Sequence, residues 1–440
     1  MHISVIGTGY VGLVTGCCFA EFGLTVVCMD TDVRRIARLE KGDVPLYEPG
    51  LTESVAKGLR DGRLSFTTDI AKAVDQALVI FIAVGTPSRS DGAADLSYVE
   101  EVAKGIARYM TGYKVIATKS TVPVGTGERI RDVIRAHQTE RYRFDIVSNP
   151  EFLREGSAIE DFLRPNRIVI GAESAEAIAI MKDLYRPLYL IETPFVITDV
   201  ASAEMIKYAS NAFLAAKVSF INEIANLCER VGADIQVVAK GMGLDHRIGA
   251  KFLHAGPGFG GSCFPKDLAA LIQTGEQAGC EMRIARATWK ANEEQRRIMV
   301  EKIRTALGGV KGKTVGVLGL SFKPNTDDLR ESPALWIAEQ LLTEGCALRV
   351  YDPAALEEGT RVLQGAVPCA DAYDAAQGAD ALLLITEWNQ FRNLDFDRIK
   401  SALRRPLFID LRNVYEPERL AAFGFQYVSV GRPDRLPKQG

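Results

Sequence analysis

The sequence predicts an α/β protein with two doubly wound parallel-sheet domains joined by a long central helix. Short runs rich in valine and isoleucine alternate with helical patterns over residues 1–200, and the same alternation returns after Lys313. Continuous apolar strands of this kind indicate a parallel sheet covered by helices on both faces. Between the two halves lies a segment of about thirty residues with a helical apolar period and no proline. The expected domains are residues 1–200, 201–300 and 301–440.

The strands expected in the first domain are recognised by their β-branched residues, and several of them end in Gly, Asp or Thr. Helical segments separate these strands, which favours parallel pairing. The first-domain strands are expected at residues 3–6, 25–29, 78–83, 114–118, 145–147, 167–170 and 196–197.

The central segment is expected to form one helix. Its apolar residues Ile206, Phe213, Phe220, Ile224 and Leu227 recur at spacings of 3, 4 and 7, and the first glycine of the segment is Gly232. Such a helix is too long for one small domain and suits a connector or the core of an oligomer. The strands of the second domain are expected at residues 314–318, 348–351, 381–385 and 407–410, and the tail at 433–440 is expected to fray.

Composition and charge exclude several classes of protein. The chain has 440 residues, 47% hydrophobic and 25% charged, so it can bury sizeable cores and is not a disordered chain. Fifty-three basic and 56 acidic residues leave a net charge of −3, which removes the electrostatic case for general nucleic-acid binding. No apolar stretch reaches the ~18–20 residues that span a bilayer, and the N-terminus does not look like a secretory signal. Eight scattered cysteines without a CxxC pair favour reduced thiols in a cytoplasmic protein.

A glycine-rich turn, GTGYVG at residues 7–12, lies between the first expected strand and a helix. Gly7 permits the tight turn, Gly9 lets the backbone approach a pyrophosphate, and Gly12 lets the helix pack against the strand. The pyrophosphate would then sit at the helix N-terminus. Asp30 ends the second strand, 18 residues after Gly12, where a carboxylate accepts hydrogen bonds from ribose hydroxyls. The pattern predicts dinucleotide binding by a Rossmann-like domain.

The acidic residue also bears on the choice of cofactor. The Asp30 carboxylate would repel the 2′-phosphate of NADP, which favours NAD. Arg34 and Arg35 follow closely and weaken this preference. A glycine turn without a ligand is the alternative interpretation, and it is disfavoured because the strand, the helix and Asp30 are all in register.

The most informative stretch is GPGFGGSCFPKD at residues 256–267. Four glycines in six residues make a loop whose backbone can approach a ligand. Pro265 suits the first turn of the helix that follows, so Cys263 is expected just before a helix N-terminus. That position, next to Lys266, favours a thiolate. The alternative is a small buried thiol, but the loop setting favours a nucleophile.

Lys207 and Asn211 lie four residues apart on the central helix, so they share one face. The same face carries Ala203, Leu214 and Val218, which indicates that it points at least partly inward. A lysine and an asparagine on such a face are unusual and suggest a site. A lysine extending to solvent from a polar edge is the alternative.

Further polar residues follow expected strands, at the edge where open parallel sheets bind their ligands. Glu151 and Glu155 follow the strand at 145–147, although a first helical turn enriched in glutamate is an equal alternative. The segments VGTP (84–87) and STVP (120–123) end two other strands and could contact a cofactor or substrate. The four histidines show no metal-ligand spacing, so no metal is expected.

These motifs together resemble those of the nucleotide-sugar 6-dehydrogenases. The similarity covers about nine-tenths of the chain, through GTGYVG, VGTP, KSTVPVGT, NPEFLREGSAIEDF, GMGLDHRIGAKFL, GFGGSCFPKD and SFKPNTDDLRESPA. The cysteine loop and NPEFLREG are the most specific of them. The resemblance implies that the C6 alcohol of a nucleotide sugar is oxidised to a carboxylate while two NAD molecules are reduced. It further implies that the sugar is carried on Cys263 as a thiohemiacetal and then as a thioester.

The resemblance also implies roles for individual residues. Lys207 and Asn211 would stabilise oxyanions, and Glu151 would be the general base in thioester hydrolysis. Thr121 and Asp267 would position the catalytic water or transfer protons, and whether Lys207, Asp267 or water takes the first proton is left open. Cofactor contacts are expected from Gly7, Gly9, Tyr10, Val11, Gly12, Asp30, Arg35, Thr86, Thr121, Glu155, Lys266 and Arg330. Substrate contacts are expected from Glu151, Phe152, Leu153, Lys207, Asn211, Arg247, Phe252, Gly260, Phe322, Lys323 and Arg412.

The resemblance also bears on the oligomeric state and on which nucleotide sugar is the substrate. In this family the residue that matches Arg247 reaches the neighbouring subunit's site, which implies a homodimer with the long helix at its core; a higher oligomer is left open. UDP-glucose is favoured over GDP-mannose by the forms GFGGSCFPKD and SFKPNTDDLRESP. UDP-N-acetyl-mannosamine is disfavoured, because Ser262 stands where a histidine is expected. An inactive nucleotide-sugar sensor would have an altered nucleophile or helix lysine, whereas Cys263 and Lys207 are both present.

Overall fold

The computed structural model describes residues 1–89 and 91–433. These described residues form two compact units. Unit 1 comprises Met1–Ser210 and Ala269–Cys280, and unit 2 comprises Asn211–Leu268 and the chain from Glu281 onward. The expectation that the tail frays concerns mainly residues 434–440, which lie outside the described residues.

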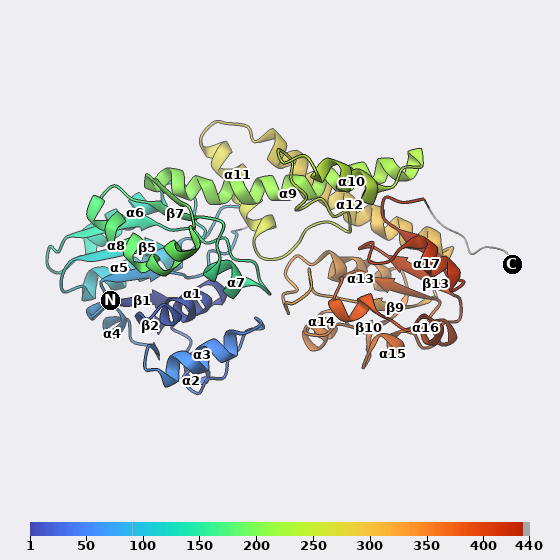
Figure 1. The fold of residues 1–440 in the computed structure, drawn as a ribbon, viewed down its shortest axis with the longest axis horizontal. Helices are drawn as coiled ribbons and strands as arrows, with labels where there is room; N and C mark the ends of the chain where they lie inside the picture. The colour runs from blue at the N-terminus through green and yellow to red at the C-terminus, as the bar shows by residue number, and fades with distance from the viewer. Residues whose placement is uncertain (90, 434–440) are drawn as a thin grey trace. The chain divides into compact units, whose positions relative to one another are not determined.

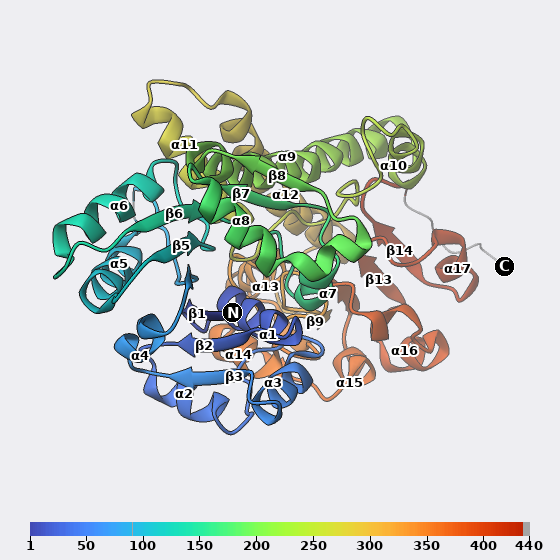
Figure 2. The same cartoon turned by 60° about the vertical axis from the view of Figure 1, so that its left-hand side comes forward.

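In its described residues, unit 1 contains an eight-stranded sheet with helices around it (Figures 1 and 2). Its strands are β1 (His2–Ile6), β2 (Thr25–Met29), β3 (Leu64–Thr67), β4 (Val79–Ile82), β5 (Lys114–Thr118), β6 (Phe144–Ser148), β7 (Ile168–Gly171) and β8 (Phe195–Thr198). They lie in the order β3-β2-β1-β4-β5-β6-β7-β8. Its helices are α1 (Tyr10–Glu21), α2 (Val33–Leu39), α3 (Leu51–Arg60), α4 (Ile70–Asp75), α5 (Ser97–Tyr109), α6 (Thr126–His137), α7 (Ala158–Leu163), α8 (Ala175–Leu184) and the 3-10 helix η1 (Arg186–Ile191).

The predicted parallel sheet is confirmed in unit 1 with one exception. β4 and β5 are buried along their whole length, as expected for central strands covered on both faces. β6 and β7, however, pair antiparallel through Ser148 and Gly171. An antiparallel neighbour needs no crossover helix, and the connection contains only the six-residue α7. The sequence interpretation had missed β3, a strand of four residues.

The expected long helix is α9 (Val200–Val231), drawn in green in Figure 1. It ends directly before Gly232, which has a positive φ of 76°. A glycine in this conformation is a common helix terminator, because it has no Cβ to clash in the left-handed region. Both α9 and α11 (Phe264–Gln277) contribute residues to the two units.

The described part of unit 2 contains a six-stranded sheet with the order β11-β10-β9-β12-β13-β14, and its strands pair in parallel. The strands are β9 (Thr314–Leu318), β10 (Ala347–Tyr351), β11 (Val367–Pro368), β12 (Ala381–Leu384), β13 (Leu407–Asp410) and β14 (Gln426–Ser429). The helices are α10 (Ile235–Gly243), α12 (Arg283–Leu307), α13 (Pro333–Thr343), α14 (Leu356–Val362), α15 (Ala372–Ala376), α16 (Phe396–Ala402), α17 (Pro417–Ala422) and the 3-10 helix η2 (Asn389–Arg392).

In both units a backbone N–H after a glycine turn donates to a carboxylate, but the two carboxylates differ in their other contacts. In each, a positive-φ glycine follows the first strand of the sheet, Gly7 in unit 1 and Gly319 in unit 2. The next backbone N–H donates to a carboxylate, Asp30 at 2.7 Å or Asp352 at 2.8 Å. In unit 2 the Trp388 indole N–H also donates to Asp352, which is only 2% exposed. Asp352 is therefore buried and bonded to protein donors, whereas Asp30 is only partly buried.

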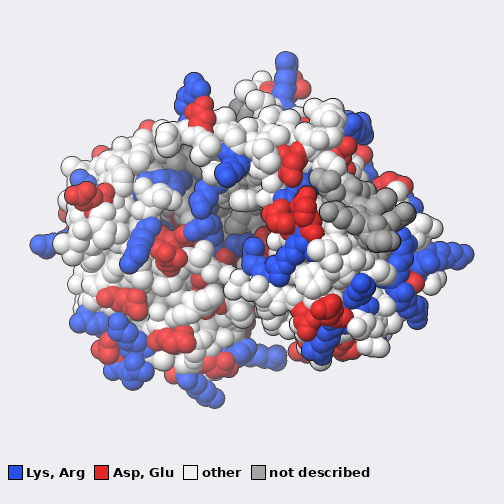
Figure 3. All heavy atoms as spheres, turned by 45° about the vertical axis from the view of Figure 1, so that its right-hand side comes forward, with Lys and Arg blue, Asp and Glu red and all other residues white. Residues whose placement is uncertain are grey.

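The surface carries both signs of charge. Figure 3 shows basic and acidic side chains interspersed over one face, in keeping with the net charge of −3. Among the described residues, no group of three or more His, Cys, Asp or Glu is placed to hold a metal ion. Within the same residues, no helix is both long and apolar enough to cross a membrane.

Candidate active site

The glycine-rich turn before α1 fits a dinucleotide. Gly7 has a φ of 102°, and a Cβ on it would lie 2.6 Å from the Ala83 carbonyl oxygen. A Cβ on Gly12 would lie 1.9 Å from the Gly7 carbonyl oxygen. Backbone thus occupies the space that a side chain would need at both positions. At Gly9, apart from its neighbours in the chain, no atom of the described residues lies within 4 Å of where a Cβ would be, so the backbone at the N-terminus of α1 is open to a pyrophosphate.

Asp30 is held in place at the end of β2. One carboxylate oxygen accepts hydrogen bonds from the backbone N and Oγ1 of Thr8, at 2.7 and 2.9 Å, and the other accepts from the Asp32 backbone N at 3.0 Å. Burial alone would raise the pKa of Asp30, but these bonds and the Arg35 guanidinium, 3.5 Å away, lower it below its ordinary value. Asp30 is therefore a carboxylate at neutral pH, the form that accepts ribose hydroxyls and repels a 2′-phosphate.

Tyr10, in the same turn, is connected to the segment that follows β6. Its hydroxyl bonds to the Glu48 carboxylate and accepts from the Gly156 backbone N at 3.0 Å. Glu48 also accepts from the backbone N of Gly156 at 2.6 Å and of Ala158 at 2.7 Å. Burial and this carboxylate raise the pKa of Tyr10, so the phenol stays protonated. Glu48 was not predicted from the sequence. Its position within the mostly apolar stretch VPLYEPG was the one feature that could have indicated it.

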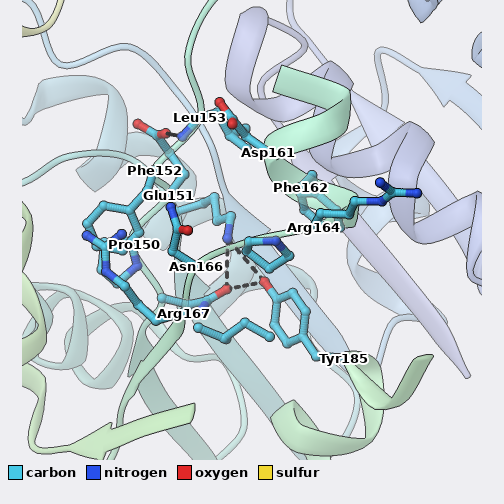
Figure 4. Close-up of a pocket in the computed structure, with 14 residues that line it drawn as sticks. Pro150, Glu151, Phe152, Leu153, Asp161, Phe162, Arg164, Asn166, Arg167 and Tyr185 are labelled. Carbon is cyan, nitrogen blue, oxygen red and sulfur yellow. Dashed lines mark hydrogen bonds between the residues drawn. The ribbon is translucent and has the colours of Figure 1, made fainter. Parts of the chain in front are cut away.

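A buried ion pair joins the segment after β6 to α9. Lys207 Nζ donates to Glu151 Oε1 at 3.0 Å, and both side chains are 5% exposed. The Leu153 backbone N donates to the other Glu151 oxygen at 2.5 Å (Figure 4). Lys207 Nζ lies 5.4 Å from the centre of the Phe152 ring, and the Arg167 guanidinium carbon lies 3.4 Å from it. The structure thus brings together four of the predicted site residues, Glu151, Phe152, Leu153 and Lys207.

Unit 1 contains a small polar cavity with a volume of about 50 Å³. Figure 4 shows residues that line it. Its lining includes Glu151 together with Lys119, Asn149 and Tyr185. A water molecule takes ~30 Å³ and needs polar partners, so the cavity has the size and the lining for water. Sequence reasoning missed these last three side chains, although Lys119 and Asn149 open the motifs KSTVPVGT and NPEFLREG.

The segments that follow β4 and β5 are bonded to each other. Thr86 Oγ1 donates to the Thr121 carbonyl oxygen at 2.9 Å, and Ser120 Oγ donates to the Val84 carbonyl oxygen at 2.7 Å. Thr86 and Ser120 are both buried. Two of the predicted site residues, Thr86 and Thr121, are therefore fixed at the carboxyl edge of the unit 1 sheet.

Cys263 directly precedes α11, as the sequence predicts, and its Sγ lies 3.5 Å from Ser262 Oγ. All eight cysteines belong to the described chain, and none of them forms a disulfide. Cys263 is half-buried and Cys280 is exposed, whereas the other six are buried. Cys263 thus differs in setting from the remaining thiols of unit 2.

Buried amides from α9 and α12 hold the glycine-rich loop before Cys263. Asn222 Oδ1 accepts from the Gly256 backbone N, and Gln295 Nε2 donates to the Gly256 carbonyl, each at 2.8 Å. Asn292 bonds to both backbone groups of Phe259, at 2.8 and 3.1 Å. Sequence reasoning missed these three amides; polar residues within the apolar pattern of two long helices were the only signal.

The same loop packs tightly within unit 2. A Cβ on Gly260 would lie 2.1 Å from the Glu331 carbonyl oxygen, and one on Gly261 would lie 2.7 Å from the Phe322 ring. Arg412 Nη2 donates to the Phe322 carbonyl at 3.1 Å. The predicted substrate residues Gly260, Phe322 and Arg412 therefore belong to one packed region.

A second polar cluster in unit 2 lies at the first turn of α11. Asn211 Nδ2 and Lys266 Nζ each donate to one oxygen of Asp267, both at 2.6 Å. Asp267 is 1% exposed, and its backbone N donates to the Cys263 carbonyl oxygen at 2.8 Å. Lys266 and Asp267 therefore lie within one helical turn of Cys263. Asn211, on α9, is connected to this turn through its bond to Asp267.

The remaining predicted residues have local contacts. Arg247 is 89% exposed and pairs with Asp245, and Arg330 pairs with Asp328. Lys323 Nζ lies 5.3 Å from the centre of the Phe322 ring, and the Phe252 and Phe264 rings are 6.0 Å apart. Val11 and Glu155 are half-buried in unit 1. The structure does not group Arg247 with the other predicted substrate residues.

A dinucleotide turn, a buried lysine–glutamate pair and a thiol at a helix start are the features of a nicotinamide-dependent dehydrogenase with a cysteine nucleophile. The chain belongs to the UDP-glucose/GDP-mannose dehydrogenase family. Residues 1–189 match the family's NAD binding domain, 201–294 its central domain, and 316–417 its UDP binding domain. Membership confirms the resemblance seen in the sequence and makes the chain an NAD-dependent oxidoreductase.

Individual relatives support the same assignment. The chain is 52% identical over 438 residues to the UDP-glucose 6-dehydrogenase of Rhizobium meliloti (strain 1021), covering 99% of this chain and 100% of that protein. It is 50% identical over 432 residues to the UDP-glucose 6-dehydrogenase TuaD of Bacillus subtilis (strain 168), covering 98% of this chain and 93% of that protein. The structure of a UDP-glucose dehydrogenase from the archaeon Pyrobaculum islandicum matches with a TM-score of 0.89 and 42% identity, covering 94% of each chain. The similarity spans both units and confirms the predicted fold class.

Proposed function

We propose that this chain oxidises UDP-glucose to UDP-glucuronate, reducing two NAD and consuming one water. The observation that carries the proposal is Cys263 at the start of α11, in a loop fixed by buried amides, in a chain about 50% identical to proteins named UDP-glucose 6-dehydrogenase. The test measures NADH formation with a panel of UDP- and GDP-sugars. Two NADH per UDP-glucose is the expected result, and a preference for GDP-mannose would overturn the choice of substrate.

NAD, when bound, supplies the acceptor for both hydrides. The turn of Gly7, Gly9 and Gly12 would bind its pyrophosphate, and Asp30 its ribose. The structural support is the steric demand for glycine at the first and third of these positions and the open backbone at the second. The further contacts proposed are Tyr10, Val11, Arg35, Thr86, Thr121, Glu155, Lys266 and Arg330.

We expect Asp30 to enforce NAD over NADP. Asp30→Ala should narrow the ratio of kcat/KM for the two cofactors by about tenfold or more, because hydrogen bonds to a charged group contribute about 1.5–3 kcal/mol. Asp32 offers the matched control: its carboxylate accepts from the backbone N of Arg34 and Arg35 and caps α2. Asp32→Ala should leave the cofactor ratio near that of the wild type. Comparable kcat/KM for NAD and NADP in the wild type would contradict the assignment.

In the proposed mechanism, the Cys263 thiolate adds to the aldehyde carbon that the first oxidation leaves. The resulting thiohemiacetal can be oxidised to a thioester without prior hydration of the aldehyde. Lys207 and Asn211 stabilise the oxyanions, supported by the burial of both side chains. Glu151 serves as the base for the water that cleaves the thioester, with Thr121 and Asp267 positioning that water. The further sugar-nucleotide contacts proposed are Phe152, Leu153, Arg247, Phe252, Gly260, Phe322, Lys323 and Arg412.

The proposal includes a homodimer formed through the central region, residues 201–300. On α9, Phe213, Phe220 and Leu227 are 67%, 48% and 53% exposed. Their spacing of seven residues places them on one helical face, and exposed apolar stripes of this kind often mark interfaces. In the same proposal Arg247, itself exposed, reaches the partner's site.

Phe220→Glu should convert the dimer to a smaller species, because a carboxylate in an apolar interface loses its hydration. Sedimentation velocity at micromolar concentration measures the change, together with the loss of turnover. Tyr98→Glu is the control, since Tyr98 is 57% exposed on α5, in unit 1. A wild-type chain that is fully active as a monomer would refute the dimer.

We propose a cytoplasmic location. None of the eight cysteines in the described residues forms a disulfide, which is typical of proteins in a reducing compartment. Burial raises the pKa of Cys17, Cys18 and Cys28, so these thiols are protected from oxidation. Fractionation of the producing cells would test the location.

A further inference from the structure

Lys119, at the carboxyl end of β5, is a buried cation with no role in the mechanism above. It is 5% exposed, and its Nζ donates to Asn149 Oδ1 and to the Tyr185 hydroxyl, both at 3.1 Å. Both partners are neutral. The rings of Phe162 and Tyr185 lie 5.8 and 5.7 Å from the ammonium. Burying an ammonium against neutral groups costs free energy.

Asn149 connects Lys119 to the segment after β6 that carries Glu151. Its backbone N donates to the Thr118 carbonyl at 2.9 Å, and its side-chain Nδ2 donates to the Val169 carbonyl at 2.7 Å. Its Oδ1 accepts from Lys119 and also from Tyr185, the latter at 2.6 Å. Asn149 is thereby bonded to β5 and β7, and one residue separates it from Glu151. Lys119 consequently helps to fix the segment between the end of β6 and Glu151.

The charge of Lys119 also interacts with the buried ion pair. Burial lowers the pKa of Lys119 to about 8, while the Glu151 carboxylate raises it and the Lys207 ammonium lowers it. The side chain is therefore mostly protonated at neutral pH, where it attracts the Glu151 carboxylate and repels the Lys207 ammonium. The other ionisable groups around it are the Cys18 and Tyr185 side chains and, lining the same cavity, Asp161, Arg164 and Arg167.

We propose that Lys119 is a positioning residue for the hydrolytic half of the reaction, acting on Glu151 through Asn149 and through its charge. This role rests on the proposed function. In the hydrolytic step the water oxygen bonds to the thioester carbon, and one water proton passes to Glu151. The carbon–sulfur bond breaks, its electron pair leaves on the Cys263 sulfur, and the product acid releases the second proton. Lys119 keeps the base in place for this step and contacts neither sugar nor cofactor.

Lys119→Met tests the inference, because methionine keeps an unbranched side chain of similar length and removes the charge and both hydrogen bonds. We expect kcat to fall about 10–100-fold, the usual cost of a misplaced catalytic group, with the KM for NAD changed less than about twofold. The sugar thioester should accumulate on Cys263, visible by intact-protein mass after an acid quench. A residue that only stabilises the fold would not shift the partition between covalent and free enzyme.

Lys114 provides a matched control at the opposite end of β5. It is also 5% exposed, and its Nζ donates to two neutral groups, the carbonyls of Asp75 at 2.8 Å and Ala77 at 2.7 Å. Lys114→Met removes a comparable buried ammonium from the same strand. It should lower the stability of the fold, but kcat should stay within about twofold of the wild type and no thioester should accumulate.

Tyr185→Phe keeps the test decisive if Lys119→Met does not fold. It preserves the ring and removes the hydroxyl that accepts from Lys119 and donates to Asn149. We expect a smaller fall in kcat with partial accumulation of the thioester. Unchanged kcat without an adduct in both variants, or losses equal to those of Lys114→Met, would overturn the inference. A wild-type chain that forms no NADH from UDP-glucose would instead refute the proposed function.

Discussion

Replacing Cys263 by serine is expected to abolish sustained turnover. A serine hydroxyl is a far weaker nucleophile than a thiolate near neutral pH, and a sugar ester is hydrolysed more slowly than a thioester. The loss should reach about 10⁴-fold or more, the scale observed when an enzyme loses its nucleophile. The loop is bonded through the backbone of Gly256 and Phe259 to buried amides, so the substitution should leave its shape intact. Steady-state NADH formation from UDP-glucose measures the effect.

The covalent step modifies residue 263, and the modified residue can be identified by peptide mass. We expect the serine variant to complete at most one slow round that leaves a sugar ester on the introduced serine. In the wild type, a thiol alkylator should inactivate the enzyme, and UDP-glucose should protect it. Because six cysteines are buried, the exposed Cys280 is the main competing target, and Cys280→Ser should remain active and still be inactivated. Sustained turnover with two NADH per sugar by the Cys263 variant would rule out an obligatory thioester.

The fold was predictable wherever the signal is local. The strands expected at 25–29, 114–118, 314–318 and 407–410 match β2, β5, β9 and β13 residue for residue, because each is a mostly apolar run of four or five residues. The end of α9 was marked by a glycine that adopts positive φ. The missed strands lack such a run: β11 has only two residues, and β3 (LSFT) and β14 (QYVS) are polar at half of their positions.

The site was predictable only in part, for the same reason. The glycine turn and the position of Cys263 before α11 are set by neighbours in the chain. The partners that hold these groups are not: Asn292 contacts Phe259 across 33 residues, and Glu48 contacts Ala158 across 110. A single amide or carboxylate carries no sign of which distant backbone group it will bond, so only the folded chain shows these supports.

Lys207→Ala should lower kcat by about 10²–10³, the usual cost of removing one preorganised oxyanion donor. The KM for NAD should change little, because Lys207 is assigned to the sugar. The alternative of a lysine extending to solvent does not fit a side chain that is 5% exposed and bonded to Glu151 at 3.0 Å. Near-normal turnover in the variant would nevertheless remove Lys207 from the mechanism. Rapid-quench measurement of the first and second NADH would show which oxidation depends on it.

The Lys207→Ala variant alone combines two effects. It removes the oxyanion donor, and it leaves the Glu151 carboxylate buried without its cation. Breaking a buried pair in this way typically costs about 3–5 kcal/mol of folding stability, so the Tm of Lys207→Ala should fall. Combining Lys207→Met with Glu151→Gln removes both charges and should recover much of the Tm, because neutral groups of similar volume replace the pair. The double variant should still lack turnover, since the oxyanion donor and the base are both gone. If turnover instead returned together with the Tm, the pair would be structural, and neither residue could hold the role proposed for it.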